Sequence, residues 1–79
     1  MTRSVHPTIA AIIRRVGELP PDLDITAEQH LRDDLGIDSL KLIDVVVHVE
    51  EELGVAIEDE QVPRMATAGD LDRHVAEPA

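Results

Sequence analysis

The stretch Leu35-Gly36-Ile37-Asp38-Ser39-Leu40 leads directly into a long, mostly apolar run from Leu42 to Leu53. Asp38 is a good N-cap residue, because its carboxylate can accept a hydrogen bond from a free N–H group at a helix start. Gly54 follows the run and is typical of a helix end. The run is rich in β-branched residues, but it lacks the alternation of a strand and its length favours a helix. We therefore predict a helix from about Ser39 to Leu53.

On a helical wheel with about 100° per residue, the apolar residues of this helix form two stripes. The first stripe has the spacing of a buried face and consists of Leu42, Val45, Val46, Val49 and Leu53. The second stripe consists of Leu40, Ile43 and Val47, and its flanking acids are Asp44, Glu50 and Glu51. An apolar strip with an acidic rim is typical of a surface that docks a partner with a basic patch. The alternative is that the second stripe packs under the long connection before the helix.

Two further helices and a long connection are expected around this element. Val5, Ile9, Ile12, Ile13 and Val16 recur at helical spacing, with Pro7 suited to the first turn and Gly17 to the end. In the connection from residue 18 to 37, the segment 26–29 reads as a capping box for a short turn of helix. The apolar residues expected to hold this connection to the core are Leu23, Ile25, Leu31 and Leu35.

After Gly54, the acidic segment 58–62 predicts a short turn of helix that Pro63 would stop. Thr67 marks a capped start for the last helix, with Leu71 and Val75 facing inward. The predicted fold is all-α: three main helices and one short helix, with a long loop between the first two main helices. We expect one domain over residues 1–79, with an ordered core at about 5–76.

The composition excludes several classes of function. The chain has 79 residues, no cysteine and no Phe, Trp or Tyr, so disulfides and cysteine zinc sites are impossible. A net charge of −10 argues against nucleic acid, where cations must neutralise phosphates. No apolar run reaches the roughly 20 residues that span a bilayer, and the N-terminus lacks a signal-peptide segment. We therefore expect a cytoplasmic monomer with no membrane partner.

Ser39 would occupy the first position of the predicted helix. Free N–H groups and the positive end of the helix dipole favour negative charge there, so a phosphate ester on its hydroxyl would be stabilised. A catalytic role would need a base and an oxyanion hole, and the histidines at 6, 30, 48 and 74 form no recognisable motif. The clustered acids lack calcium-loop spacing, so no metal site is expected. From its chemistry alone, Ser39 is either an ordinary residue beside a cap or a modification site.

The stretch from Leu35 to Leu40 closely resembles the phosphopantetheine attachment motif of acyl carrier proteins, whose centre is Asp-Ser-Leu. The resemblance extends to the long first loop, the acidic second helix ending at Gly54, the acidic turn at 58–60 and the helix start at Thr67. It implies that Ser39 carries 4′-phosphopantetheine, taken from coenzyme A by a phosphopantetheinyl transferase, and that acyl groups form thioesters with the thiol of this arm. The protein would then be a carrier and not an enzyme.

The resemblance also implies roles for neighbouring residues. Asp38 would assist the transferase by helping to hold its magnesium ion. The family's partner-recognition positions fall on Leu40, Asp44, Val47 and Glu51, within the second stripe and its rim, so acyl-loading and acyl-processing enzymes with basic patches are the expected partners.

Lys41 stands where bacterial fatty-acid carriers usually have an acid, which favours a specialised, polyketide-like pathway. The alternatives are a housekeeping fatty-acid carrier and an unmodified acidic interaction module.

Overall fold

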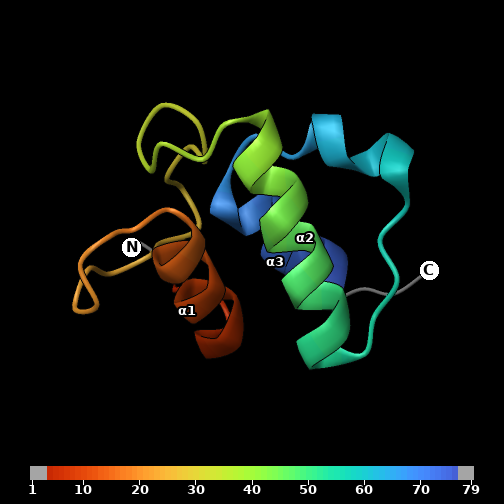
Figure 1. Cartoon of the computed structure of the whole chain (residues 1–79), viewed down its shortest axis with the longest axis horizontal. Helices are drawn as coiled ribbons and strands as arrows, with labels where there is room; N and C mark the ends of the chain where they lie inside the picture. The colour runs from red at the N-terminus through yellow and green to blue at the C-terminus, as the bar shows by residue number, and fades with distance from the viewer. Residues whose placement is uncertain (1–3, 77–79) are drawn as a thin grey trace.

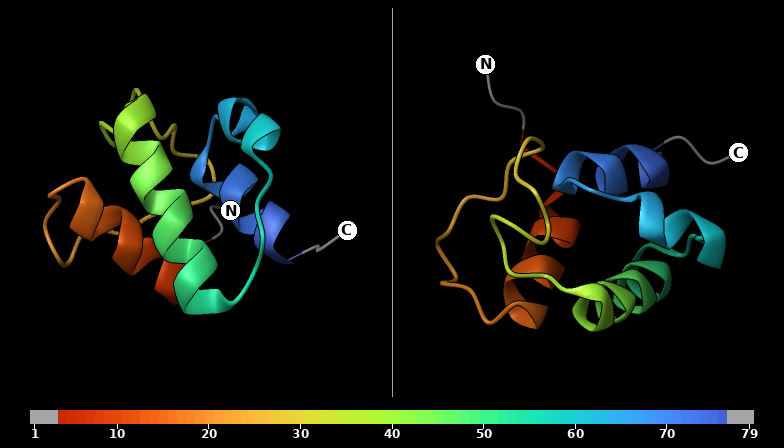
Figure 2. Two further views of the ribbon diagram at one scale, coloured as in Figure 1. Left: turned by 45° about the vertical axis from the view of Figure 1, so that its right-hand side comes forward. Right: turned by 90° about the horizontal axis from the view of Figure 1, so that it is seen from above.

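The computed structural model describes the backbone of residues 4–76 and the burial of side chains for residues 4–75. Over this range the chain forms α1 (Pro7–Val16), α2 (Ser39–Leu53), the 3-10 helix η1 (Asp59–Arg64) and α3 (Ala68–Ala76). The three α-helices surround the centre of the molecule, and η1 lies at the end where α2 begins (Figures 1 and 2). The predicted all-α fold, with its long connection between α1 and α2, is confirmed. None of the described helices is long and apolar enough to cross a membrane.

α1 begins and ends where its sequence predicts. Pro7 is its first residue, and the Nδ1 atom of His6 accepts a hydrogen bond from the Thr8 N–H group at 3.1 Å. Gly17 caps the other end with φ −79°, which any residue can adopt. Its surroundings are close, because a Cβ atom at residue 17 would lie 2.9 Å from Ile37 Cδ1 and 3.0 Å from the Ile13 carbonyl oxygen. The end of α1 therefore packs closely against the residue that precedes Asp38.

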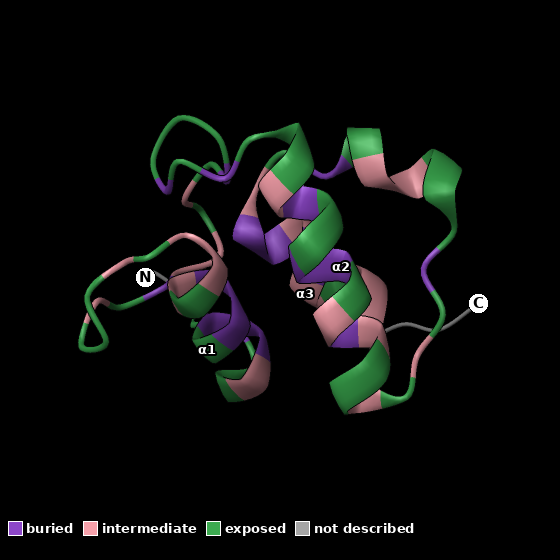
Figure 3. Cartoon of the chain, in the orientation of Figure 1, coloured by how far each residue is buried: buried purple, intermediate pink, exposed green. Residues whose placement is uncertain are grey.

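The core is aliphatic and draws on all three α-helices and on the long connection between α1 and α2. Its most deeply buried large side chains are Ile9, Ile12, Ile13, Leu31, Ile37, Val45, Val49 and Leu71. Figure 3 shows the buried positions of α1 and α2 on their facing sides. Of the residues expected to hold the connection, Ile25, Leu31 and Leu35 are buried, and Leu23 packs against the core while half-buried. That prediction is confirmed.

The prediction of a helical turn at residues 26–29 is wrong. One half of the capping box forms, because Gln29 Oε1 accepts a hydrogen bond from the Thr26 N–H group at 2.9 Å. The backbone nevertheless makes a turn and not a helix. Its carbonyl groups instead accept the first N–H groups of α3: Ala27 O binds Gly69 N at 2.9 Å and Gln29 O binds Ala68 N at 3.0 Å.

The expectation that Pro63 would stop the short helix is also wrong. Pro63 lies inside η1, which ends at Arg64. Proline lacks only its own N–H donor, so the carbonyl groups before it can still accept bonds from later residues. Met65 N–H donates to Val62 O at 3.2 Å, and the turn therefore closes around the proline.

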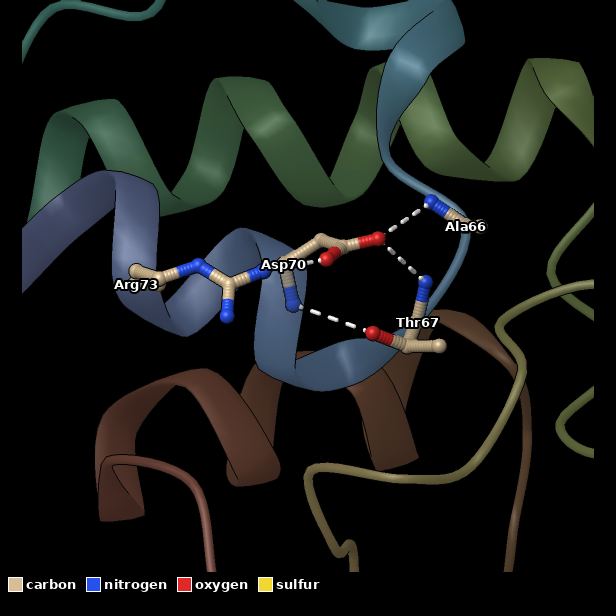
Figure 4. A network of polar contacts seen from close by, with 4 residues as sticks. All are labelled: Ala66, Thr67, Asp70 and Arg73. Carbon is tan, nitrogen blue, oxygen red and sulfur yellow. Dashed lines mark hydrogen bonds and ion pairs between the residues drawn. The ribbon is translucent and has the colours of Figure 1, made fainter.

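The capped start of α3 is confirmed (Figure 4). Asp70 N–H donates to Thr67 Oγ1 at 3.1 Å, while Asp70 Oδ2 accepts from Thr67 N–H at 3.1 Å and from Ala66 N–H at 3.0 Å. Burial of the Asp70 carboxylate would raise its pKa, but these hydrogen bonds and the nearby Arg73 guanidinium outweigh that effect. The pKa of Asp70 is therefore lowered.

Candidate functional site

A left-handed glycine directs the chain into the start of α2. Gly36 has φ +67°, a conformation that side chains disfavour. The two flanking residues, Leu35 and Ile37, are each only 2% exposed and anchor this bend in the core. Ile37 N–H also donates to Leu31 O at 2.7 Å. The backbone is therefore fixed on both sides of the glycine before it reaches Asp38.

Asp38 and Ser39 have the predicted positions at the helix start. Asp38 is the N-cap, and its Oδ1 atom accepts a hydrogen bond from the Lys41 N–H group at 2.9 Å. Ser39 is the first residue of α2 and is exposed. Its hydroxyl makes no hydrogen bond with any residue between 4 and 76. A free hydroxyl beside the N–H groups of a helix start suits the attachment of a phosphate ester.

Neither of the two histidines closest to α2 in the sequence bonds to Ser39. His48 Nδ1 lies 2.7 Å from the Asp44 carbonyl oxygen, one turn back on the same helix. His30 Nδ1 lies 3.5 Å from Asp34 Oδ2. The described residues therefore contain no nucleophile–base pair that includes Ser39, and they hold no cluster of three or more metal-ligating side chains.

The second stripe of α2 is exposed along its length. Leu40 is 77% exposed, Ile43 is 52% exposed and Val47 is 42% exposed. The residues of the first stripe on the same helix are buried, apart from the half-buried Leu53. The alternative that the preceding connection covers the second stripe is therefore wrong.

The three predicted rim acids differ in how free they are. Asp44 and Glu51 are exposed, and their carboxylates make no hydrogen bond or ion pair with residues 4–76. Glu50 is half-buried, and its Oε2 atom accepts a hydrogen bond from the Ile57 N–H group at 2.8 Å. Glu50 thus also holds the chain that leaves α2.

An apolar groove, which the sequence did not reveal, runs between α2 and η1. Its volume is about 460 Å³. Ser39 lines this α2–η1 groove together with the apolar residues Ile43, Val46, Val47, Val62 and Pro63. The exposed edge of the second stripe is therefore also one wall of the groove. Val62 and Pro63, two apolar residues within an acidic turn, were the available signal in the sequence.

Comparisons with known proteins agree with the resemblance that the sequence motif shows. A family model described as "Phosphopantetheine attachment site" matches residues 6–75. The acyl carrier protein of Acidothermus cellulolyticus is 40% identical over 68 residues, which cover 86% of this chain and 80% of that protein. The meromycolate extension acyl carrier protein of Mycobacterium leprae is 39% identical over 67 residues, which cover 85% of this chain and 57% of that protein.

A solved structure of a candidate acyl carrier protein from Mycobacterium tuberculosis is also similar. It superposes with a TM-score of 0.79 at 41% identity, and the match covers 86% of this chain and 89% of that one. Acyl carrier proteins carry their cargo between biosynthetic enzymes and do not catalyse the reactions themselves. This chain belongs to the phosphopantetheine-binding acyl carrier protein family, with a covalently attached phosphopantetheine as its prosthetic group.

Proposed function

We propose that Ser39 is the attachment residue, and that this protein carries acyl groups as thioesters on the arm bound there. The observation that carries the proposal is an exposed hydroxyl at the first position of α2, unbonded within the described chain and bordering an apolar groove. In the attachment step, Ser39 Oγ forms a bond to the phosphorus next to the pantetheine. The bond from that phosphorus to the nucleotide part of coenzyme A breaks, and the serine proton passes to a base of the transferase.

The bound group supplies the thiol, which a chain without cysteine cannot provide. Asp38 contributes in two ways. Its Oδ1 atom fixes the first turn through the Lys41 N–H group, and its Oδ2 atom makes no bond to residues 4–76. We assign this second oxygen to assisting the transferase, where a carboxylate can help to hold magnesium.

The attachment can be tested by intact mass, because the chain has only two serines. Incubation with coenzyme A, magnesium and a broad-specificity phosphopantetheinyl transferase should add the mass of one phosphopantetheine. Ser39→Ala should abolish the addition, and the matched control Ser4→Ala should retain it. An unmodified, folded wild-type protein would favour the pure interaction module instead.

The second stripe and its acids are the proposed docking surface. Leu40, Ile43 and Val47 would supply apolar contact area, while Asp44, Glu51 and the outer part of Glu50 would orient a partner that carries a basic patch. The partners are the transferase and the enzymes that load and process the acyl group. Because the stripe begins at Leu40, a docked partner lies beside the attachment residue.

We further propose that a loaded acyl chain lies in the α2–η1 groove. Burial of its methylene groups against Val46 and Val62 would be favourable, because apolar surface is removed from water. Amide NMR spectra should show shifts at these residues when an octanoyl group replaces the free thiol. A loaded chain that leaves both amides unmoved would remain in solvent.

We place the carrier in a specialised pathway, with housekeeping fatty-acid synthesis as the alternative. Lys41 changes the charge pattern beside Ser39, and a meromycolate extension carrier is among the relatives. Bacterial housekeeping elongation enzymes should therefore accept the loaded protein poorly. Elongation at the rate of their own carrier would favour the housekeeping assignment.

A further inference from the structure

Ser39 borders a second groove as well as the apolar one. This loop groove lies between the turn at residues 30–38 and the segment 63–66, which extends from the end of η1. Its volume is about 320 Å³. Ser39, Leu42 and Pro63 line both grooves. The attachment residue therefore lies on the divide between two hollows of the surface.

The two grooves differ in chemistry. The loop groove has an apolar floor that includes the buried residues Leu31, Ile37 and Met65. Its exposed rim carries polar and charged side chains, namely His30, Arg32, Asp33 and Asp38. The α2–η1 groove has aliphatic walls, and the charged residues among its described lining are the acids Glu50 and Asp59. One groove can thus solvate polar groups and the other suits hydrocarbon.

Arg32 is the one permanent cation among the described residues that line the loop groove. Its guanidinium makes no ion pair or hydrogen bond with any residue from 4 to 76. A phosphodiester on Ser39 would add negative charge to a groove that already contains the carboxylates of Asp33 and Asp38. Guanidinium groups bind phosphate oxygens through charge-assisted hydrogen bonds, so Arg32 has the chemistry to offset that charge.

We propose that the loop groove is the resting site of the unloaded phosphopantetheine arm, with Arg32 as the cation that binds its phosphodiester. This inference rests on the proposed attachment at Ser39. The arm's hydroxyl and amide groups match the polar rim, and its dimethyl carbon matches the apolar floor. Because the arm is tethered at the divide, its effective concentration in either groove is high and a weak interaction is enough to hold it.

A loaded arm changes the balance between the grooves. An acyl chain adds hydrocarbon that gains most from the aliphatic walls of the α2–η1 groove. The chain is covalently continuous with the arm, so occupying that groove draws the arm away from the loop groove. The two positions would distinguish a free carrier from a loaded one.

The test compares amide NMR spectra of the apo, holo and octanoyl forms, each checked first by intact mass. We expect the apo-to-holo step to shift the amides of Arg32, Asp33 and Ala66. Loading with octanoyl should reverse those shifts and move the amides of Val46 and Val62. A failed mass addition would reject the attachment at Ser39. A single adduct whose shifts stay within residues 38–40, or already fall on Val46 and Val62, would reject the loop groove alone.

Two variants make the test specific. Ala66 is exposed and lines the loop groove, so Ala66→Leu should fill the groove and abolish the holo shifts at Arg32 and Asp33. Ala56→Leu is the matched control, because Ala56 is exposed and lines neither groove. Arg32→Gln should move the ³¹P resonance of the holo protein toward that of the same phosphodiester in holo protein unfolded with urea. An unchanged ³¹P resonance would remove Arg32 from the proposal.

Discussion

The two apolar stripes of α2 contain the same kinds of side chain but have opposite surroundings. Val46 and Val47 are neighbours in the sequence, yet Val46 is 5% exposed and Val47 is 42% exposed. Their 100° separation on the helix turns one toward the core and the other toward solvent. An apolar residue in an amphipathic helix is therefore not necessarily buried. On this helix the exposed apolar residues lie beside Ser39, the proposed attachment residue, where a partner could cover them.

The stability of the fold should depend on the first stripe and hardly on the second. Val45→Ala removes two buried carbon atoms and leaves a cavity, which should cost about 2 kcal/mol. The melting temperature should fall by roughly 8–16 °C for a domain of this size. The matched Val47→Ala should change the free energy of unfolding by less than about 0.5 kcal/mol. Thermal unfolding followed by circular dichroism measures both, and equal losses would mean that Val47 is also a core residue.

The rate of docking should instead depend on the second stripe and its rim acids. Asp44→Lys combined with Glu51→Lys should slow attachment by the transferase about tenfold at low salt, because the rim would repel a basic patch. The slowing should shrink as added salt screens the charges. Asp22→Lys combined with Asp24→Lys, on an exposed part of the first connection, changes the net charge by the same amount and is the control for net charge alone. If both variants slow the initial rate equally while helicity is unchanged, the second stripe is not the docking surface.

A smaller effect on stability is expected from an acid outside α2, Asp70, whose carboxylate caps the start of α3. The folded pKa of Asp70 lies below its usual value of about 3.9. Its carboxylate therefore stabilises the fold above about pH 4, and this contribution disappears as the pH falls through the folded pKa. Asp70→Asn should be less stable than wild type near neutral pH, with the difference narrowing in acid. A series of unfolding curves from neutral to acid pH measures this difference in the free energy of unfolding, and a difference that stays constant across the series would contradict the prediction.

Local signals made the centre of the molecule predictable. The cap at Asp38, the stop at Gly54 and the periodicity between them are properties of neighbouring residues, and all three correctly fixed the limits of α2. The same holds for the exposed stripe, since a helix that buries one face must turn the opposite residues outward.

The sequence-based predictions failed where the backbone conformation depends on contacts with distant segments of the chain. The turn at 26–29 has local helix-capping residues, but its carbonyl groups bind the start of α3, some 40 residues later. Gly69 carries the one available signal: a Cβ atom there would lie 2.7 Å from the Ala27 carbonyl oxygen. Without the partner segment in view, that glycine reads only as an unfavourable residue for a helix. The two grooves at Ser39 were likewise not predicted, because each lies between separate segments whose relative placement is decided by tertiary packing.

The pairing of the long connection with α3 links motions of two remote parts of the chain. Leu31 N–H donates to Ala66 O at 2.9 Å, beside the bonds that Ala27 and Gln29 make to the first residues of α3. A fluctuation that detaches the start of α3 would break these bonds together and release the backbone that leads into Asp38. Local unfolding at the start of α3 would therefore extend to Ser39, the proposed attachment residue, although Ser39 belongs to a different helix.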